Sequence, residues 1–289
     1  MLRDPEERVE RRGSRYVTGV ALALLTLVVL VLAGPQPLSV AKPAQAAAPA
    51  EVNFPGGGMQ LRGFIWRPTG AGPFPALLWN HGSEKLPGWL PGLAPVFVRQ
   101  GYVFFIPHRR GQGRSPGPYI QDQIEQAGSR AERSRLLVEL HELQLNDQIA
   151  ALAFLKNQSY VDSGRLAVAG CSYGGIQTVL AAERETGYRA AIDFAGGAES
   201  WQASPDLQRR MIRAVHSATV PIFFIQAEND HDLAPSRVLA AEMQRVGKPH
   251  QLRIYPRFGS TADEAHAFCV RGADVWAADV VSYLNANLK

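Results

Sequence analysis

The sequence predicts an α/β fold with a mainly parallel central sheet, and two observations support it. Short apolar runs alternate along the chain with longer segments whose apolar residues recur at helical spacing. Parallel strands need crossover connections, and helices between buried strands supply them. The chain has 289 residues and is 46% hydrophobic, which is enough for one large core.

The expected strands begin with residues 59–68, where apolar side chains alternate with polar ones as on a half-buried strand. The stretches FPALLWN (74–80) and YVFFIP (102–107) are instead continuous apolar runs, which are typical of strands buried on both faces. The remaining strands are expected at 165–170, 189–195, 220–226 and 251–256.

Helices are expected between these strands. Residues 120–157 lack proline and contain one glycine, and their leucines recur at helical spacing, so they predict one or two helices. Two interpretations of segment 119–145 stay open, namely a small helical lid over a site or the extension of a surface helix. The other helices are expected at 90–100, 174–185, 235–246 and 273–288.

The first 46 residues differ from the rest of the chain. Arginines cluster at the start, residues 17–33 are apolar, and Ala44-Gln45-Ala46 is a small-residue cleavage site. This order predicts a cleaved export signal at 1–46 and a periplasmic, secreted or otherwise extracytoplasmic domain at 51–289. The apolar run nearly reaches the length of a membrane span, so an uncleaved N-terminal anchor stays open as the alternative.

Charge and cysteine content exclude two further classes of protein. The formal net charge of +4 is small, and the arginine-rich start of the chain carries much of it. No basic stripe remains elsewhere, so we expect no nucleic-acid partner. Two cysteines, Cys171 and Cys269, are too few for a disulfide-rich scaffold.

A candidate nucleophile follows the expected strand at 165–170. The chain there reads Gly170-Cys171-Ser172-Tyr173-Gly174 and passes directly into a helix, which is the G-x-S-x-G pattern in its strand–turn–helix context. The turn is so sharp that side chains two residues before and after the nucleophile would strike neighbouring backbone. Glycines fill both positions only when Ser172 is central, so we expect Ser172 rather than Cys171 to attack.

A serine nucleophile needs a base, and the base needs a carboxylate that orients it. His266 lies between the last expected strand and the last helix, whereas His216 and His250 lie near element ends away from the expected site. Asp230 follows the strand at 220–226 and is the expected acid. Asp232 stays open as the alternative acid or as a cap of the following helix.

The expected oxyanion hole uses two backbone N–H donors. Tyr173 directly follows the nucleophile and supplies one. Ser83, in the Asn80-His81-Gly82-Ser83 loop after strand 74–80, supplies the other. We expect His81 to hold this loop and not to transfer protons.

Five segments carry a resemblance to a known family: NHGSE, HRRGQGRSPG, GCSYGG, AENDHDLAP and HAF. With them the chain resembles α/β-hydrolases of the dienelactone hydrolase and prolyl-oligopeptidase-like group. Dienelactone hydrolases proper carry cysteine where this chain has Ser172, and prolyl-oligopeptidase relatives usually carry a β-propeller for which the chain has no room. The resemblance therefore implies an esterase-like hydrolase rather than a peptidase. His108 stands where the group carries aspartate.

Two further hypotheses concern the surroundings of the site. Cys171 precedes the nucleophile and Cys269 follows the base by three residues, so they predict either a disulfide that braces the site or two small buried side chains. Trp89, Trp201 and Phe268 are candidates for an apolar acyl pocket or for ordinary core and rim.

The function expected from these residues is serine-dependent cleavage of a carboxylic ester through an acyl-enzyme, without metal or organic cofactor. The substrate is expected to be a small-molecule ester or, second, a short peptide or aminoacyl compound. The rival from another class is a non-catalytic envelope binding protein on a hydrolase scaffold.

Overall fold

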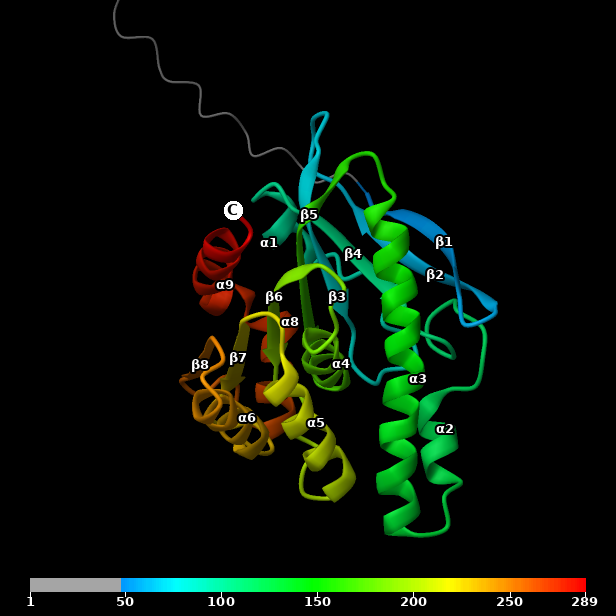
Figure 1. Ribbon diagram of the computed structural model, residues 1–289, viewed down its shortest axis with the longest axis vertical. Coiled ribbons are helices and arrows are strands. Elements are labelled where there is room, and N and C mark those ends of the chain that lie inside the picture. Colours follow the sequence, from blue (N-terminus) through cyan, green and yellow to red (C-terminus); the bar gives the residue numbers. More distant parts are fainter. Residues whose placement is uncertain (1–47) are drawn as a thin grey trace, which may run out of the picture. The chain divides into compact units, whose positions relative to one another are not determined.

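The computed structural model describes residues 48–289, and within them eight strands form one sheet. Their spatial order is β1-β2-β4-β3-β5-β6-β7-β8 (Figure 1). Strand β2 pairs antiparallel with β1 and β4, and every other pair is parallel. The strands are β1 Ala50–Gly56, β2 Met59–Trp66, β3 Phe74–Asn80, β4 Val103–His108, β5 Val161–Cys171, β6 Tyr188–Phe194, β7 Ile222–Ala227 and β8 His250–Tyr255.

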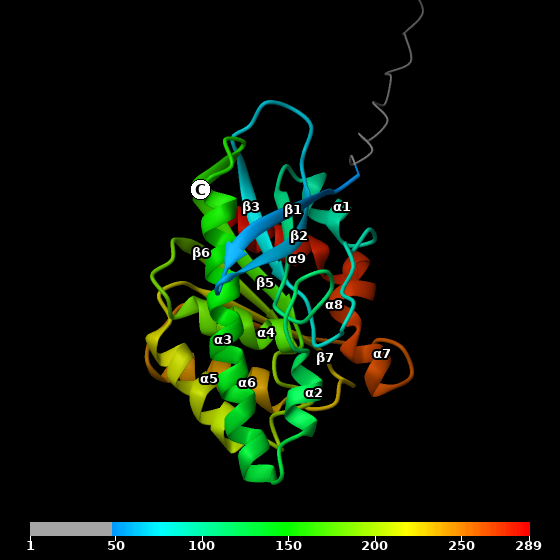
Figure 2. The same cartoon turned by 90° about the vertical axis from the view of Figure 1, so that its right-hand side faces the viewer.

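Helices cover both faces of this sheet, as the turned view makes plain (Figure 2). Within residues 48–289 the helices are α1 Ala94–Val98, α2 Ile120–Glu125, α3 Arg130–Lys156, α4 Tyr173–Ala182, α5 Pro205–Ser217, α6 Ala234–Arg245, α7 Ala262–His266, α8 Phe268–Arg271 and α9 Ala273–Asn287. This is the α/β architecture that the alternating pattern predicts. The leader predicted at 1–46 lies outside the described residues.

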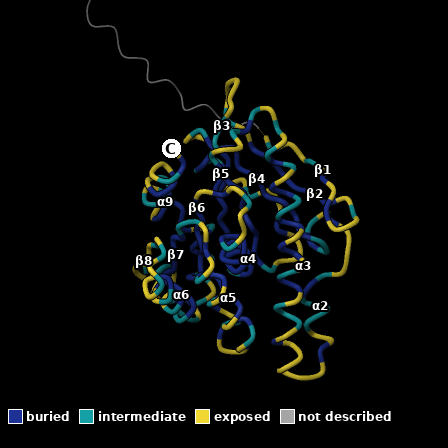
Figure 3. The backbone as a smooth tube through the Cα atoms, in the orientation of Figure 1, coloured by how far each residue is buried: buried dark blue, intermediate teal, exposed yellow. Residues whose placement is uncertain are grey.

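Two hydrophobic cores sandwich the sheet because successive strand residues point to opposite faces. Leu78 packs into the core beneath α3 to α6, and its neighbour Leu77 packs into the core beneath α1, α8 and α9. The central strands are therefore buried on both sides (Figure 3). This double burial explains why FPALLWN and YVFFIP are continuous apolar runs.

The segment 119–145 forms α2 and the first part of α3, which lie side by side (Figure 1). Gly128 separates the two helices, and the side chain of Ser129 caps α3 by accepting from the backbone N–H of Glu132. The sequence prediction of one or two helices at 120–157 is thus confirmed as two. Among residues 48–289, no helix has both the length and the hydropathy that crossing a membrane requires.

Some elements differ from the prediction. The helix expected at 90–100 is the shorter α1, because Pro91 and Gly92 interrupt its start and Pro95 favours the first helical turn. Strand β1 and helices α5, α7 and α8 are additional to the predicted elements. Helices α7 and α8 have five and four residues, which is too short for a periodic pattern to show in the sequence.

Candidate active site

Ser172 occupies a strained turn between β5 and α4. Its backbone has φ 55° and ψ −117°, a left-handed value that a residue with a side chain rarely adopts. A Cβ at Gly170 would lie 2.2 Å from the carbonyl oxygen of Gly174, and one at Gly174 would lie 2.0 Å from that of Asn80. The two glycines therefore permit the close packing that the G-x-S-x-G register predicts.

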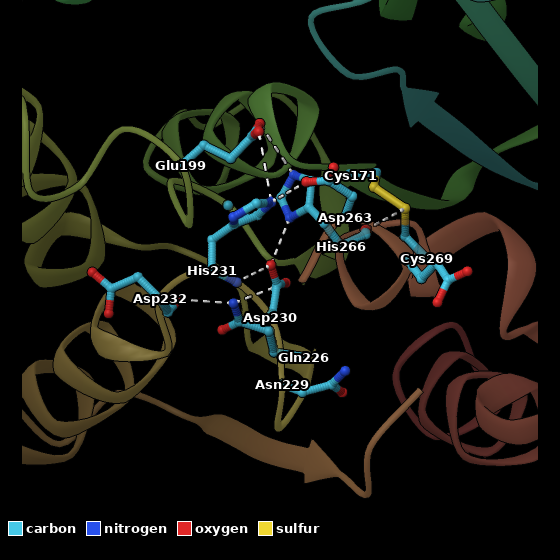
Figure 4. A network of polar contacts seen from close by, with 12 residues as sticks. Cys171, Glu199, Gln226, Asn229, Asp230, His231, Asp232, Asp263, His266 and Cys269 are labelled. Atoms are coloured by element: carbon cyan, nitrogen blue, oxygen red, sulfur yellow. Dashed lines mark hydrogen bonds and ion pairs between the residues drawn. A yellow bond between two sulfur atoms is a disulfide. The ribbon is translucent and has the colours of Figure 1, made fainter. Parts of the chain in front are cut away.

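The structure brings His266 and Asp230 together from different elements (Figure 4). Nδ1 of His266, at the end of α7, lies 2.9 Å from Oδ1 of Asp230, in the loop after β7. The Asp230 side chain is fully buried and accepts from Gln226 Nε2 at 3.0 Å and from the backbone N–H of His231 at 2.7 Å. These donors hold the carboxylate in place against the imidazole.

Asp232, the alternative acid, points elsewhere (Figure 4). Its Oδ1 accepts from the backbone N–H of Ala234 at 2.8 Å, and its Oδ2 accepts from Gln202 at 2.9 Å. It therefore caps the start of α6. His216 likewise lies away from Ser172, with Nε2 2.7 Å from Glu242.

The loop after β3 brings Ser83 to the cavity that Ser172 and Tyr173 also line. Buried Arg109 holds this loop, because its Nη2 donates to the carbonyl oxygens of His81 at 2.9 Å and of Gly82 at 2.6 Å. The Gly82–Ser83 peptide unit is planar and trans, so its N–H points opposite to its C=O. The N–H of Ser83 is thereby directed away from Arg109.

Two histidines next to this loop are structural. Nδ1 of His81 lies 3.0 Å from the carbonyl oxygen of Gly82, and burial, followed by the charge of Arg109, lowers the pKa of His81 well below its ordinary value. Neutral His81 therefore holds the loop, in line with the role predicted for it. His108, where the resembling group carries aspartate, donates through Nε2 to the carbonyl of Gly88 at 2.9 Å.

Glu199 is a site residue that the sequence reasoning missed. It lies in the turn after β6, and its Oε2 is 3.4 Å from Nε2 of His266 (Figure 4). Glu199 also lines the same cavity as Ser172. A signal was available, because Glu199 follows the carboxyl end of a parallel strand at the edge where Ser172 and Asp230 lie.

These contacts determine the charge of His266. Burial disfavours its protonation, but the carboxylates of Asp230 and Glu199 outweigh burial and raise its pKa to about 9. The interaction with His266 in turn lowers the pKa of Glu199. At neutral pH the resting site therefore holds an imidazolium between two carboxylates.

A cavity of about 420 Å³ opens beside Ser172. Helices α2 and α3 form one wall of it, so segment 119–145 lies over the site as well as extending a surface helix. Its lining residues are Ser83, Gln121, Ile124, Arg130, Arg133, Ser134, Leu137, Ser172, Tyr173, Ile176, Gly197, Glu199, Ser200, Ala203 and Ser204. Within residues 48–289, no group of three or more His, Cys, Asp or Glu side chains is arranged to hold a metal ion.

The aromatic candidates for an acyl pocket do not line this cavity. Trp201 and Phe268 are buried in the two cores, and Trp89 is 46% exposed and packs against Phe64. Their alternative roles as core and rim are therefore correct. Phe268 packs against Tyr255, with ring centroids 5.2 Å apart, because burial stabilises large apolar side chains.

Cys171 and Cys269 form the hypothesised disulfide, with their Cα atoms 5.9 Å apart. The bond joins the end of β5, one residue before Ser172, to α8, three residues after His266. It therefore ties the segment that carries the candidate nucleophile to the segment that carries the candidate base.

An eight-stranded, mainly parallel sheet with a serine on the strained turn after β5 and a buried His–Asp pair at the same edge defines a serine hydrolase of the α/β-hydrolase fold. The chain belongs to the dienelactone hydrolase family, whose model matches residues 93–287.

Relatives with known names include several peptidases. Dipeptidyl-peptidase 5 of Porphyromonas gingivalis is 26% identical over 190 residues, which are 56% of this chain and 26% of that protein. The chain therefore spans about a quarter of that relative's length. An acylaminoacyl peptidase from Pyrococcus horikoshii has a TM-score of 0.66 at 17% identity, over 85% of this chain and 42% of its own.

A smaller structural neighbour matches over nearly its whole length. A Klebsiella pneumoniae protein assigned as a dienelactone hydrolase has a TM-score of 0.61 at 17% identity, over 83% of this chain and 97% of its own. At these identities the two solved structures establish the fold.

The disulfide leads to a prediction about thiols. Native protein, unfolded without reductant, is expected to show no titratable thiol with Ellman's reagent and two after reduction. Reduction is also expected to lower the melting temperature, because the bond closes a loop of 98 residues, for which loop-closure entropy predicts at most about 5 kcal/mol. Two free thiols in unreduced protein would contradict the bond.

The ion pairs of His266 lead to a prediction about pH. Its imidazole is expected to titrate at about 9 in histidine-selective NMR, with His266→Gln to assign the signal. Because the pKa of His266 is higher in the folded protein than in the unfolded chain, its ion pairs stabilise the fold. The stabilisation is complete below about pH 6.5, the pKa of an unfolded histidine, and is lost as pH rises through about 9. Titration of His266 at or below 6.5 would show that the carboxylates do not hold its proton.

Proposed function

We propose that the protein is a serine hydrolase that cleaves carboxylic esters through an acyl-enzyme, with Ser172, His266 and Asp230 as its catalytic triad. The observation that carries this proposal is the link between the strained Ser172 turn and the His266–Asp230 pair through Glu199, which lines the cavity with Ser172 and lies 3.4 Å from Nε2 of His266. The order of the three residues along the chain, Ser, Asp, His, is the order that this fold uses and supports the assignment.

Each residue has a role that follows from its chemistry. Neutral His266 accepts the Ser172 proton at Nε2, and the Ser172 oxygen attacks the ester carbonyl carbon. The imidazolium returns this proton to the departing alcohol, and an acyl-enzyme remains. Water then repeats the sequence with His266 as base and releases the acid. Asp230, bound to Nδ1, keeps the imidazole in the tautomer that leaves Nε2 free to accept.

The backbone N–H groups of Tyr173 and Ser83 are proposed to stabilise the oxyanion that forms on attack. Support comes from the contacts of Arg109, which fix the Gly82–Ser83 peptide from behind. Gln112 adds a donor to the same carbonyl at 3.3 Å, and Tyr119 donates to the carbonyl of Ser83 at 2.7 Å. A donor held in this way needs little rearrangement when charge develops.

A second candidate function is hydrolysis of a peptide or aminoacyl bond. The peptidases among its relatives support it, and so does the charged cavity, where Glu199, Arg130 and Arg133 accompany a few apolar side chains. A cavity of about 420 Å³ suits a small ester or a short peptide.

We also propose that the domain works outside the cytoplasm. The leader pattern at 1–46 and the Cys171–Cys269 disulfide support this location, because disulfides persist in oxidising compartments. Residues 17–33 would anchor the protein to a membrane if the leader is not removed.

Labelling with a fluorophosphonate tests the nucleophile. The full chain is expected to be labelled, and Ser172→Ala is expected to abolish labelling because the reagent reacts with an activated serine. Ser200→Ala is the matched control, since Ser200 lines the same cavity and is expected to leave labelling unchanged. No label on folded wild type would favour the non-catalytic binding protein, and label retained by Ser172→Ala would assign another nucleophile.

Replacement of Arg109 tests the loop that carries Ser83. Arg109→Met is expected to lower kcat on a 4-nitrophenyl ester by about tenfold to a hundredfold with a smaller change in KM, because the donor acts mainly in the transition state. Arg114→Met is the control, since Arg114 is exposed and pairs with Glu51. If kcat/KM fell through KM alone, or if the folded variant lost no activity, Arg109 would not position the oxyanion hole.

A further inference from the structure

We infer that the hydrolase acts on acyl groups that carry a free α-amino group, and that Glu199 binds the protonated amine beside the scissile carbonyl. This inference rests on the proposed function, since it assigns a substrate class to the same cavity. It concerns a residue that the triad chemistry does not use.

The backbone holds Glu199 in a constrained turn. Ala195 has φ 55° and Gly197 has φ 87°, so two left-handed residues fold the chain directly after β6. The buried carboxylate of Asp193 accepts from the backbone N–H of Gly196 at 2.8 Å and fixes the start of this turn. A strained turn that is over-determined in this way holds its side chains at set positions.

Glu199 has an unusual set of charged neighbours. Among residues 48–289, its ion-pair partners are two histidines and neither a lysine nor an arginine. Nε2 of His266 lies 3.4 Å away and Nε2 of His231 lies 3.9 Å away, and His231 is closer to Asp263, at 3.0 Å. The Glu199 side chain remains 53% exposed and lines the cavity beside Ser172.

Catalysis itself removes the main partner of Glu199. His266 must be neutral at Nε2 before it can accept the Ser172 proton. Once His266 is neutral, the Glu199 carboxylate faces the cavity without a fixed positive charge close to it. A protonated amine on the substrate would take the place of the imidazolium, and it would release His266 to act as a base.

The position of the carboxylate limits where this amine lies on the substrate. Glu199 lines the cavity with Ser172 and lies 3.4 Å from Nε2 of His266, the atom proposed to take the Ser172 proton, so its partner must lie near the carbonyl carbon that Ser172 attacks. An α-amino nitrogen is two bonds from that carbon, whereas an amine on a longer side chain is farther away. An α-ammonium acyl group therefore fits the contact.

The α3 wall of the cavity carries the opposite charge. Arg130 donates to the carbonyls of Gln202 and Ala203, and Arg133 donates to that of Ala127. Neither arginine pairs with Glu199 within the described chain, so both leave its carboxylate available. The cavity is thus polarised, and it suits an aminoacyl ester or short peptide that presents its amine to Glu199 and another carbonyl or carboxylate group to the arginines.

The experiment compares two esters that differ by one group. L-alanine ethyl ester and ethyl propionate are hydrolysed by the full-length protein in a pH-stat at pH 6.5, where an α-amino group with a pKa of about 8 is protonated. The ammonium also activates the ester chemically. The decisive quantity is therefore the ratio of the two kcat/KM values, measured in wild type and in Glu199→Gln.

Glu199→Gln is expected to lower this ratio by about tenfold or more, which is the usual effect of leaving a desolvated charge without its partner. Asp263→Asn is the matched control, because Asp263 pairs with His231 but is 89% exposed and does not line the cavity. Its ratio is expected to stay within twofold of wild type.

Three results would overturn the inference. An unchanged ratio in Glu199→Gln, with ethyl propionate still hydrolysed, would contradict amine recognition and leave the esterase function standing. If Asp263→Asn lowered the ratio as much as Glu199→Gln does, the preference for the amino ester would come from the summed negative charge of the acidic groups and not from Glu199. No hydrolysis of either ester, or of 4-nitrophenyl butyrate, would contradict the proposed function itself.

Discussion

The tight packing of the Ser172 turn against the end of β3 is the constraint on which the site depends. At Gly174 the backbone approaches Asn80 and His81 so closely that a single added carbon would overlap their carbonyl oxygens. This contact places the end of β5 against the loop that carries Ser83. The left-handed backbone of Ser172 follows from this packing, because the turn from β5 to α4 is too short for a relaxed backbone conformation.

Two carboxylates flank one imidazole in very different environments. The Asp230 side chain is fully buried and held by several donors, so it stays in contact with His266 and orients its imidazole. Glu199 is half-exposed to the cavity and meets the same ring from the other side. The buried group suits a permanent structural partner, and the exposed one suits an exchangeable partner such as a substrate cation. Environment, rather than residue type, separates their roles.

A buried arginine behind the oxyanion loop is another consequence of this arrangement. Arg109 gives its hydrogen bonds to the carbonyls of His81 and Gly82 and to Gln112 rather than to a carboxylate, and burial lowers its pKa to about 10. It remains charged at neutral pH, and its charge orders the loop. Helices α2 and α3 form another wall of the cavity.

Several features were predictable because they depend on local sequence. The alternation of apolar runs predicts the parallel sheet, and the glycine spacing around Ser172 predicts, by steric exclusion, the strained turn that the structure shows there. The contact between His266 and Asp230 was predictable, because carboxyl ends of neighbouring parallel strands meet at one edge. The sequence did not decide between Asp230 and Asp232, since both follow β7 and only the fold shows which one faces His266.

Tertiary structure alone decided the rest. The wall of the cavity combines residues from α2, α3 and the turn after β6, and linear spacing does not encode how these segments pack. Trp201 and Phe268, which the sequence analysis considered for a pocket, lie in the cores, because burial of large apolar area dominates their placement. The sequence by itself determined the fold and the strained turn at Ser172, because that turn depends on local sterics. Only the folded chain placed Glu199 against His266 and joined Cys171 to Cys269, because those contacts connect residues far apart in the sequence.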